Sequence, residues 1–131
     1  MSKRPIICVD FDGVLHSYTS GWQGAGVAND PPVDGAEQWL YDMTEQFRVA
    51  IYSSRSKSLA GRACMQRYAR KHFNMMTTWS TDHRGDYLFE CLEWPWFKPS
   101  ALVTLDDRAI CFDGTFPTIE TIRGFKPWNK R

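Results

Sequence analysis

Three short apolar runs constrain the fold of this chain more than any other feature of its sequence. They are PIICV from Pro5, RVAIY from Arg48 and ALVTL from Ala101. Polar and apolar residues do not alternate in these runs, which is typical of strands covered on both faces, as in a parallel sheet. A weaker run, AICF from Ala109, is a candidate for a further strand.

Helical patterns lie between the runs. The first is an apolar stripe with spacings of four, three and four, made by Ala36, Leu40, Met43 and Phe47. Asp34, followed three places later by Glu37, resembles a capping box and predicts that this helix begins near Asp34. A second helical pattern extends over residues 60–73, and its other face carries the basic residues Arg62, Arg67, Arg70 and Lys71. This basic face is either a solvated helix surface or a track for nucleic acid.

The order strand, helix, strand, helix, strand predicts an α/β fold with a central, mostly parallel sheet and right-handed crossovers. The 131 residues contain no repeat, low-complexity segment or internal linker, so we expect a single domain over residues 1–131. Residues 83–100 fit no single regular element because they contain two prolines and crowded aromatic side chains. Within them, Trp94, Trp96 and Phe97 either cover an edge of the core or stack nucleobases.

Composition narrows the class of protein. Hydrophobic residues make up 43% of the chain and charged residues 24%, as in ordinary globular proteins. The net charge of +1 excludes a strong long-range attraction to nucleic acid or to a membrane, although a local basic patch is compatible with it. The N-terminal apolar run is too short for a signal peptide, and no stretch approaches the ~20 apolar residues that span a bilayer. We therefore expect a cytoplasmic protein with no membrane partner.

Polar residues follow each of the three apolar runs. Asp10 and Asp12 follow the first run, and the second and third runs are followed by Ser53, Ser54 and Arg55 and by Asp106, Asp107 and Arg108. In parallel α/β sheets, ligands bind in the crevice outside the carboxyl ends of the strands. The sequence therefore predicts one shared site at this edge of the sheet.

Four carboxylates in one site would repel one another and raise each other's pKa values. A divalent cation relieves this conflict, and ligands that are all oxygen suit Mg²⁺, which completes its shell with water and substrate phosphate. Alternate residues of an extended chain point the same way, so Asp10 and Asp12 are expected to face one pocket. One carboxylate can attack phosphorus and the other can move the proton. Gly13 would allow a close approach of the backbone or a positive φ, while Ser53 and Arg55 can donate to phosphoryl oxygens.

Three motifs resemble those of the haloacid dehalogenase superfamily. CVDFDGVL resembles the first motif, VAIYSSR the second and VTLDD the fourth, in the right order over residues 6–107. The resemblance implies a three-layer αβα, Rossmann-like fold with a minimal cap. It also implies that Asp10 is the nucleophile, Asp12 the general acid/base and Ser53 a catalytic phosphate ligand. The Mg²⁺ ligands would be the Asp10 carboxylate, the Asp12 main-chain carbonyl and the Asp106–Asp107 pair, with Asp106 favoured as the direct ligand.

One motif departs from the family pattern. The third motif is a lysine that steadies the nucleophile and the phosphate, and a helix usually separates it from the acidic pair. Lys98 stands in the common Lys-Pro context, but only seven residues separate it from Asp106. We expect Lys98 to take this catalytic role, with Lys57 as the alternative. The four expected substrate-binding residues are Gly13, Ser54, Arg55 and Arg108.

Residues 14–33 form a Gly-rich stretch that can act as a small lid loop but is too short for a cap domain. Members of the family without a cap tend to accept large substrates. His16, Tyr18 and Trp22 in this stretch either contact substrate or serve packing. The arginines in SSR and DDR also resemble the phosphatase domain of polynucleotide kinase/phosphatase proteins, and small phage and bacterial members are similar in size.

Together these patterns predict an Mg²⁺-dependent phosphomonoester hydrolase that acts through an aspartyl-phosphate. A polynucleotide 3′-phosphatase or a nucleotide phosphatase is the substrate class expected, so the partner is a phosphorylated nucleic acid or nucleotide. Two alternatives stay open: a phosphate-binding module of the same fold without turnover, and a phosphotransferase of the same superfamily. The oligomeric state does not follow from the sequence.

Overall fold

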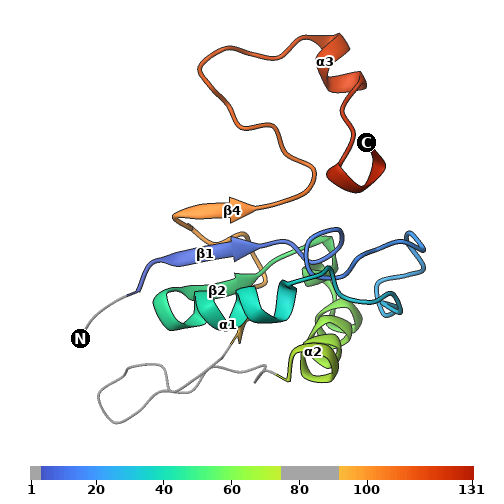
Figure 1. Cartoon of the computed structure of the whole chain (residues 1–131), viewed down its shortest axis with the longest axis vertical. Coiled ribbons are helices and arrows are strands. Elements are labelled where there is room, and N and C mark those ends of the chain that lie inside the picture. The colour runs from blue at the N-terminus through green and yellow to red at the C-terminus, as the bar shows by residue number, and fades with distance from the viewer. Residues whose placement is uncertain (1–3, 75–91) are drawn as a thin grey trace.

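The computed structural model describes residues 4–74 and 92–131 and has a mixed α/β fold (Figure 1). Its sheet has four strands in the order β3-β2-β1-β4, and every neighbouring pair is parallel. The strands are β1 (Ile6–Val9), β2 (Arg48–Ile51), β3 (Leu92–Glu93) and β4 (Val103–Leu105). The prediction of an α/β fold with a parallel sheet is therefore confirmed.

The core lies between the sheet and two helices, α1 (Ala36–Gln46) and α2 (Leu59–Phe73). Ile7 and Val9 of β1 stand opposite Val49 and Ile51 of β2, so these four side chains share one face of the sheet. They form a single buried cluster with side chains of both helices, among them Leu40, Met65, Tyr68 and Phe73. On the opposite face, Cys8 and Ala50 are also buried. The first two apolar runs are therefore covered on both faces, as predicted.

The two main helices begin differently. The Ser58 side chain accepts a hydrogen bond from the Gly61 backbone N–H and caps α2, which occupies the predicted range. The capping box predicted at Asp34 is wrong, because the N-cap residue of α1 is Gly35, with no side-chain cap. Gly35 takes a φ of 85°, and its carbonyl accepts the hydrogen bond from Trp39, so the helix begins only after it. None of the helices in residues 4–74 and 92–131 is long and apolar enough to cross a membrane.

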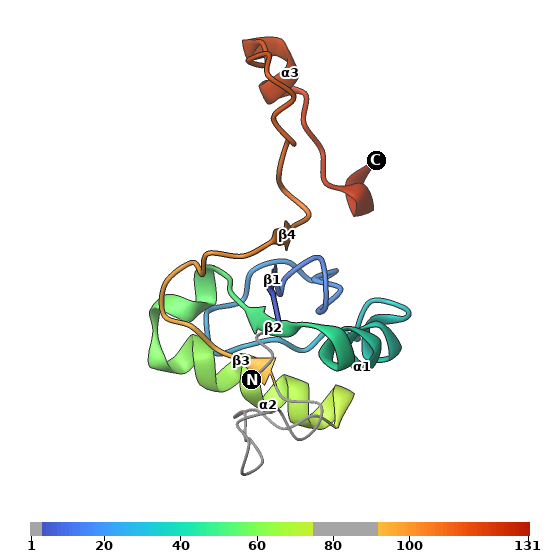
Figure 2. The same cartoon turned by 90° about the vertical axis from the view of Figure 1, so that its left-hand side faces the viewer.

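β4 lies at one edge of the sheet, beside β1. All three of its residues are exposed, so the prediction that this run is covered on both faces is wrong. The strand predicted from Ala109 is also wrong, since residues 109–112 form no regular element. After β4 the chain leaves the sheet and passes through α3 (Ile119–Arg123), and the 3-10 helix η2 (Trp128–Lys130) then turns back toward the loop that follows β1 (Figures 1 and 2). The excursion carries exposed apolar side chains such as Phe116 and Ile119.

The segment predicted to be irregular can be followed only from Leu92, because residues 83–91 lie outside the described part of the chain. Leu92 and Glu93 form β3, which pairs with β2 and is tied to it by the Arg48–Glu93 ion pair at 2.7 Å. Trp94 is buried and belongs to the core cluster, whereas Trp96 is exposed and lies under the Arg62 guanidinium. For Trp94 the structure therefore supports the interpretation that the side chain covers an edge of the core.

Candidate functional site

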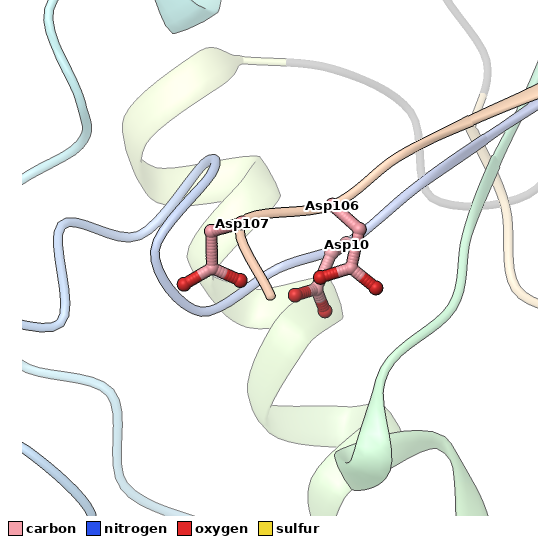
Figure 3. A group of neighbouring side chains, drawn as sticks. All are labelled: Asp10, Asp106 and Asp107. Carbon is pink, nitrogen blue, oxygen red and sulfur yellow. The ribbon is translucent and has the colours of Figure 1, made fainter. Parts of the chain in front are cut away.

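The carboxyl ends of β1 and β4 bring three aspartates together. The strands pair in register up to Val9 and Leu105, and the next backbone N–H, that of Asp10, donates to the Leu105 carbonyl at 2.9 Å. Asp10 therefore lies beside Asp106 and Asp107, which follow β4. One carboxylate oxygen from each of the three residues lies within 4.8 Å of the others (Figure 3). The predicted convergence of the first and third strand ends is thus present.

Burial and mutual repulsion raise the pKa of two members of this acidic cluster, Asp10 and Asp107. Burial, helped by the charges of Asp106 and Asp107, raises the pKa of Asp10 from 3.8 to about 8. The pKa of Asp107 is also raised, chiefly by burial. Within residues 4–74 and 92–131 no salt bridge reaches these three carboxylates, and they make an all-oxygen donor set, which is the kind of site that a hard divalent cation occupies. The residues present therefore fit a divalent metal, and Asp10, Asp106 and Asp107 are the side chains that would hold it.

Gly13 makes room for one member of this cluster. Its φ is 81°, and a Cβ atom placed on it would overlap the Asp107 carboxylate. No other residue type fits here without moving Asp107 or straining the backbone. The Gly13 carbonyl also accepts a hydrogen bond of 2.8 Å from the Trp128 indole N–H, which fastens η2 to the loop after β1.

The Asp12 carboxylate has hydrogen-bond partners of its own, different from those of Asp10. The chain turns directly after Asp10, because the backbone N–H groups of Leu15 and His16 both donate to the Phe11 carbonyl. The Asp12 carboxylate is outside the acidic cluster and binds Arg55 and His16 instead. Burial alone would raise its pKa, but these hydrogen bonds and the Arg55 charge outweigh burial and lower it.

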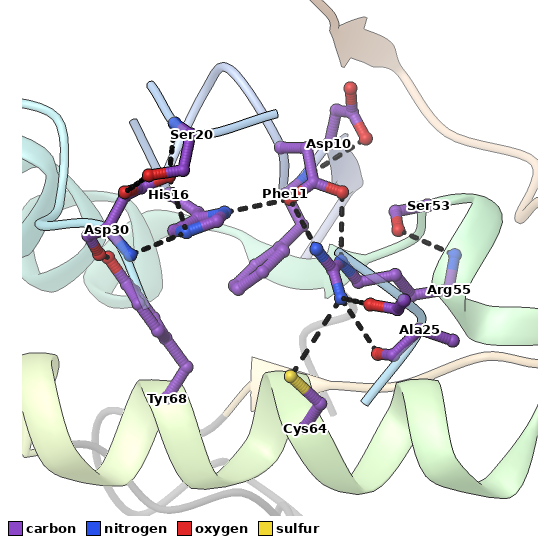
Figure 4. Close-up of polar contacts among 12 residues, drawn as sticks. Asp10, Phe11, His16, Ser20, Ala25, Asp30, Ser53, Arg55, Cys64 and Tyr68 are labelled. Carbon is purple, nitrogen blue, oxygen red and sulfur yellow. Dashed lines mark hydrogen bonds and ion pairs between the residues drawn. The ribbon is translucent and has the colours of Figure 1, made fainter. Parts of the chain in front are cut away.

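Arg55 is enclosed by protein, with a relative exposure of 1%. Its Nε donates to Asp12 Oδ2 at 2.9 Å and its Nη2 to Asp12 Oδ1 at 3.1 Å (Figure 4). Its Nη1 donates to the carbonyls of Gly24 and Ala25 in the Gly-rich loop over residues 14–33. The guanidinium that was expected to bind substrate therefore joins Asp12 to this loop.

Ser53 and Ser54 begin the 3-10 helix η1 (Ser54–Lys57) that follows β2. The Ser53 hydroxyl accepts from the Arg55 backbone N–H at 2.9 Å, and the Ser53 N–H donates to Ser56 Oγ at 3.0 Å, which completes a capping box. Ser53 is thus a helix cap, although its hydroxyl keeps an O–H of its own to donate. Ser54 is exposed.

The remaining candidate cations are exposed. Lys98 lies in the loop between β3 and β4, and Lys57 ends η1. Burial raises the pKa of the Cys8 thiol on β1, and the charge of Lys98 opposes this effect, so Lys98 lies close to the strand that carries Asp10. Arg108 is anchored at its backbone, where its N–H donates to Asp106 Oδ1 at 2.9 Å.

Three residues of the site were missed or given no definite role by sequence reasoning. His16 is buried against Asp12, Asp30 contacts His16, and Trp128 contacts Gly13. The spacing of four between Asp12 and His16 is the only local sign of the first contact. The partners Asp30 and Trp128 lie too far along the chain for a local pattern to reveal them.

No protein-family model, curated protein or solved structure matches this chain.

Proposed function

We propose that this protein is an Mg²⁺-dependent phosphomonoester hydrolase that acts through an aspartyl-phosphate on Asp10. The observation that carries the proposal is the meeting of Asp10 with Asp106 and Asp107 at the ends of adjacent parallel strands, with one oxygen of each within 4.8 Å. Mg²⁺ bound by these carboxylates would offset their repulsion and the charge of an incoming phosphate. The finer fold that accompanies the proposal is the three-layer Rossmann-like fold of the haloacid dehalogenase superfamily.

The chemistry divides between the two aspartates of the first motif. A carboxylate oxygen of Asp10 bonds to phosphorus while the phosphorus–oxygen bond to the leaving group breaks, and the protonated form of Asp12 gives the leaving oxygen its proton. Water then attacks the phosphorus and transfers a proton to Asp12, which frees Asp10 and inorganic phosphate. Lys98, Ser53 and Arg108 are the candidates for contacts to the phosphoryl oxygens.

The substrate class proposed is a nucleic acid with a terminal 3′-phosphate or a nucleotide. Two features of the chain support it. The arginine of the DDR segment, Arg108, resembles that of polynucleotide phosphatases, whereas Arg55 of SSR is enclosed. The segment between Gly13 and α1 is a loop rather than a domain. Of the two arginines, Arg108 has an exposed side chain.

Phosphate release from a substrate panel tests the proposal. The panel contains an aryl phosphate, nucleotides, sugar phosphates and 3′- and 5′-phosphorylated oligonucleotides, each with Mg²⁺ and with a chelator. Asp10→Asn is compared with Asp42→Asn, a matched change at an exposed aspartate of α1. We expect release that requires Mg²⁺, survives in Asp42→Asn and falls at least about 10³-fold in Asp10→Asn.

Two other outcomes would favour one of the alternative functions. Mg²⁺ binding by a folded protein that releases no phosphate from any substrate would contradict hydrolysis and favour a binding module. Transfer of the phosphoryl group to an added alcohol in preference to water would favour a phosphotransferase.

A further inference from the structure

His16 contacts the Asp12 carboxylate, and its tautomer is fixed by a backbone hydrogen bond. Its Nδ1 lies 2.8 Å from Asp12 Oδ1, and its Nε2 lies 3.1 Å from the Asp30 backbone nitrogen (Figure 4). A backbone N–H can only donate, so Nε2 must accept. The ring proton therefore resides on Nδ1, where it is donated to the Asp12 carboxylate.

The imidazole is held on all sides. His16 is 1% exposed and stacks on Phe11 with ring centroids 5.4 Å apart. The Tyr68 ring meets it edge-on at 5.2 Å, and the Tyr68 hydroxyl donates to the Asp30 carbonyl at 2.8 Å. The Asp30 carboxylate is engaged by the Ser20 N–H and hydroxyl at 2.8 and 2.6 Å. The segment that supplies the Asp30 N–H is thus fixed in place as well.

Two residues hold the Asp12 carboxylate. Arg55 Nε and Nη2 donate to its two oxygens as a fork, which restricts its geometry. His16 Nδ1 donates a further hydrogen bond to Oδ1, so the carboxylate is held by a second residue as well.

We propose that His16 is a positioning residue that fixes the Asp12 carboxylate for proton transfer, with the Asp30 backbone N–H selecting the donating tautomer. The proposal rests on the proposed function, because it assigns Asp12 the acid/base role. His16 itself is too buried to touch substrate. It acts through Asp12 and connects residues 16–30 of the Gly-rich loop to the proton-transfer step.

Two amide substitutions distinguish the role of Nδ1 from that of Nε2. The His16→Asn side chain places its N–H₂ near the position of Nδ1 and keeps a donor for Asp12. The His16→Gln side chain reaches the position of Nε2 and can accept from Asp30, but it leaves Asp12 without that donor. Both proteins are first compared with the wild type by thermal unfolding, so that activity is measured only on folded protein.

The activity measurement compares kcat/KM for an alkyl phosphate with kcat/KM for a nitrophenyl phosphate. An alkoxide leaving group needs a proton from Asp12, whereas nitrophenolate leaves without one. We expect His16→Gln to lose about tenfold more on the alkyl than on the aryl substrate, in the same direction as Asp12→Asn. We expect His16→Asn to keep the wild-type ratio. An equal loss on both substrates in folded His16→Gln would overturn the proposal.

The tautomer is measured separately, by ¹⁵N–¹H correlation of the His16 ring in the wild-type protein. We expect the proton on Nδ1 and an unprotonated Nε2. A proton on Nε2 alone, in an enzyme whose activity depends on Asp10, overturns the role of His16 and leaves the proposed function intact. A wild type without Asp10-dependent phosphate release removes the proposed function and the positioning role, whereas the tautomer then reports only the hydrogen bonds.

Discussion

Asp10 and Asp12 are two positions apart, and their carboxyl groups depart from the ordinary pKa in opposite directions. Burial and two neighbouring carboxylates raise the pKa of Asp10, whereas Arg55 and His16 lower that of Asp12. In the metal-free protein at neutral pH the proton therefore resides on Asp10 rather than on Asp12, and a cation bound by the acidic cluster would favour the ionised, nucleophilic form of Asp10. The turn after Asp10 makes this difference possible, because it sends the two side chains to different partners.

Gly13→Ala is expected to disrupt the acidic cluster. The new Cβ would overlap the Asp107 carboxylate, and the φ of 81° adds about 1–2 kcal/mol of backbone strain. Gly35→Ala is the matched control, since Gly35 has a φ of 85° but nothing within 4 Å of the added atom. We expect both variants to lose stability in urea unfolding and only Gly13→Ala to lose phosphate release, by at least about tenfold. Equal activities in the two variants would contradict the close approach of Asp107.

At the scale of elements, the predictions that the structure confirms are those that depend on the pattern of neighbouring residues. The apolar run over residues 48–52 corresponds to β2, and the helical pattern over residues 60–73 corresponds to α2. The predictions that are wrong concern positions where contacts with distant parts of the chain determine the structure. Gly35, and not Asp34, adjoins the first helical turn, and the run from Ala109 has no strand to pair with in the described structure. β3 has only two residues, too few to give a pattern.

Gly61→Ala should destabilise the protein, although alanine normally stabilises a helix relative to glycine by about 1 kcal/mol. Gly61 lies in the first turns of α2, where an added Cβ would overlap the backbone of Arg55. Overpacking of this kind costs roughly 1–3 kcal/mol and would move the residue that grips Asp12. Urea unfolding measures the change, with Arg70→Ala on the exposed face of the same helix as a control expected within about 0.5 kcal/mol. A Gly61→Ala protein as stable as the wild type would show that α2 does not pack this tightly on η1.

At the scale of the whole molecule, topology explains how much of the candidate site could be predicted. Strands that run parallel end at one edge, so the meeting of Asp10 with Asp106 and Asp107 followed from the sequence. The partners of Arg55 did not follow, because nothing in SSR indicates whether an arginine faces solvent or is enclosed. The buried contact of His16 depends on α2 and on residues 20–30 packing around it, which no local pattern encodes.

Stability of the metal-free protein should fall as pH rises from 5 to 8. Asp10 has a pKa of about 8 in the folded protein and 3.8 as its ordinary value. In this window the folded state therefore holds a proton that the unfolded chain releases, and the stabilisation present at low pH is lost as pH rises. The expected decrease in the free energy of unfolding is on the order of 3 kcal/mol. Urea unfolding at several pH values measures it.

The same experiment has an internal control. Asp10→Asn cannot titrate, so its stability should vary less with pH than that of the wild type. Mg²⁺ should stabilise the wild type more at pH 8 than at pH 5, because protons compete for the same carboxylates. An unchanged pH dependence in Asp10→Asn would show that Asp10 is not the group responsible.

The bond between Trp128 and Gly13 joins positions 115 residues apart, and β1 gains its partner β4 only from residues 103–105. On the ribosome, Asp10 is therefore made long before the residues that complete its surroundings. Until β4 arrives, the nascent chain carries β1 with an open edge, which is a place where chains pair wrongly. Contacts of such long sequence separation also form slowly. This protein should acquire its acidic cluster as one of the last events of folding, after β1, β2, α1 and α2 have come together.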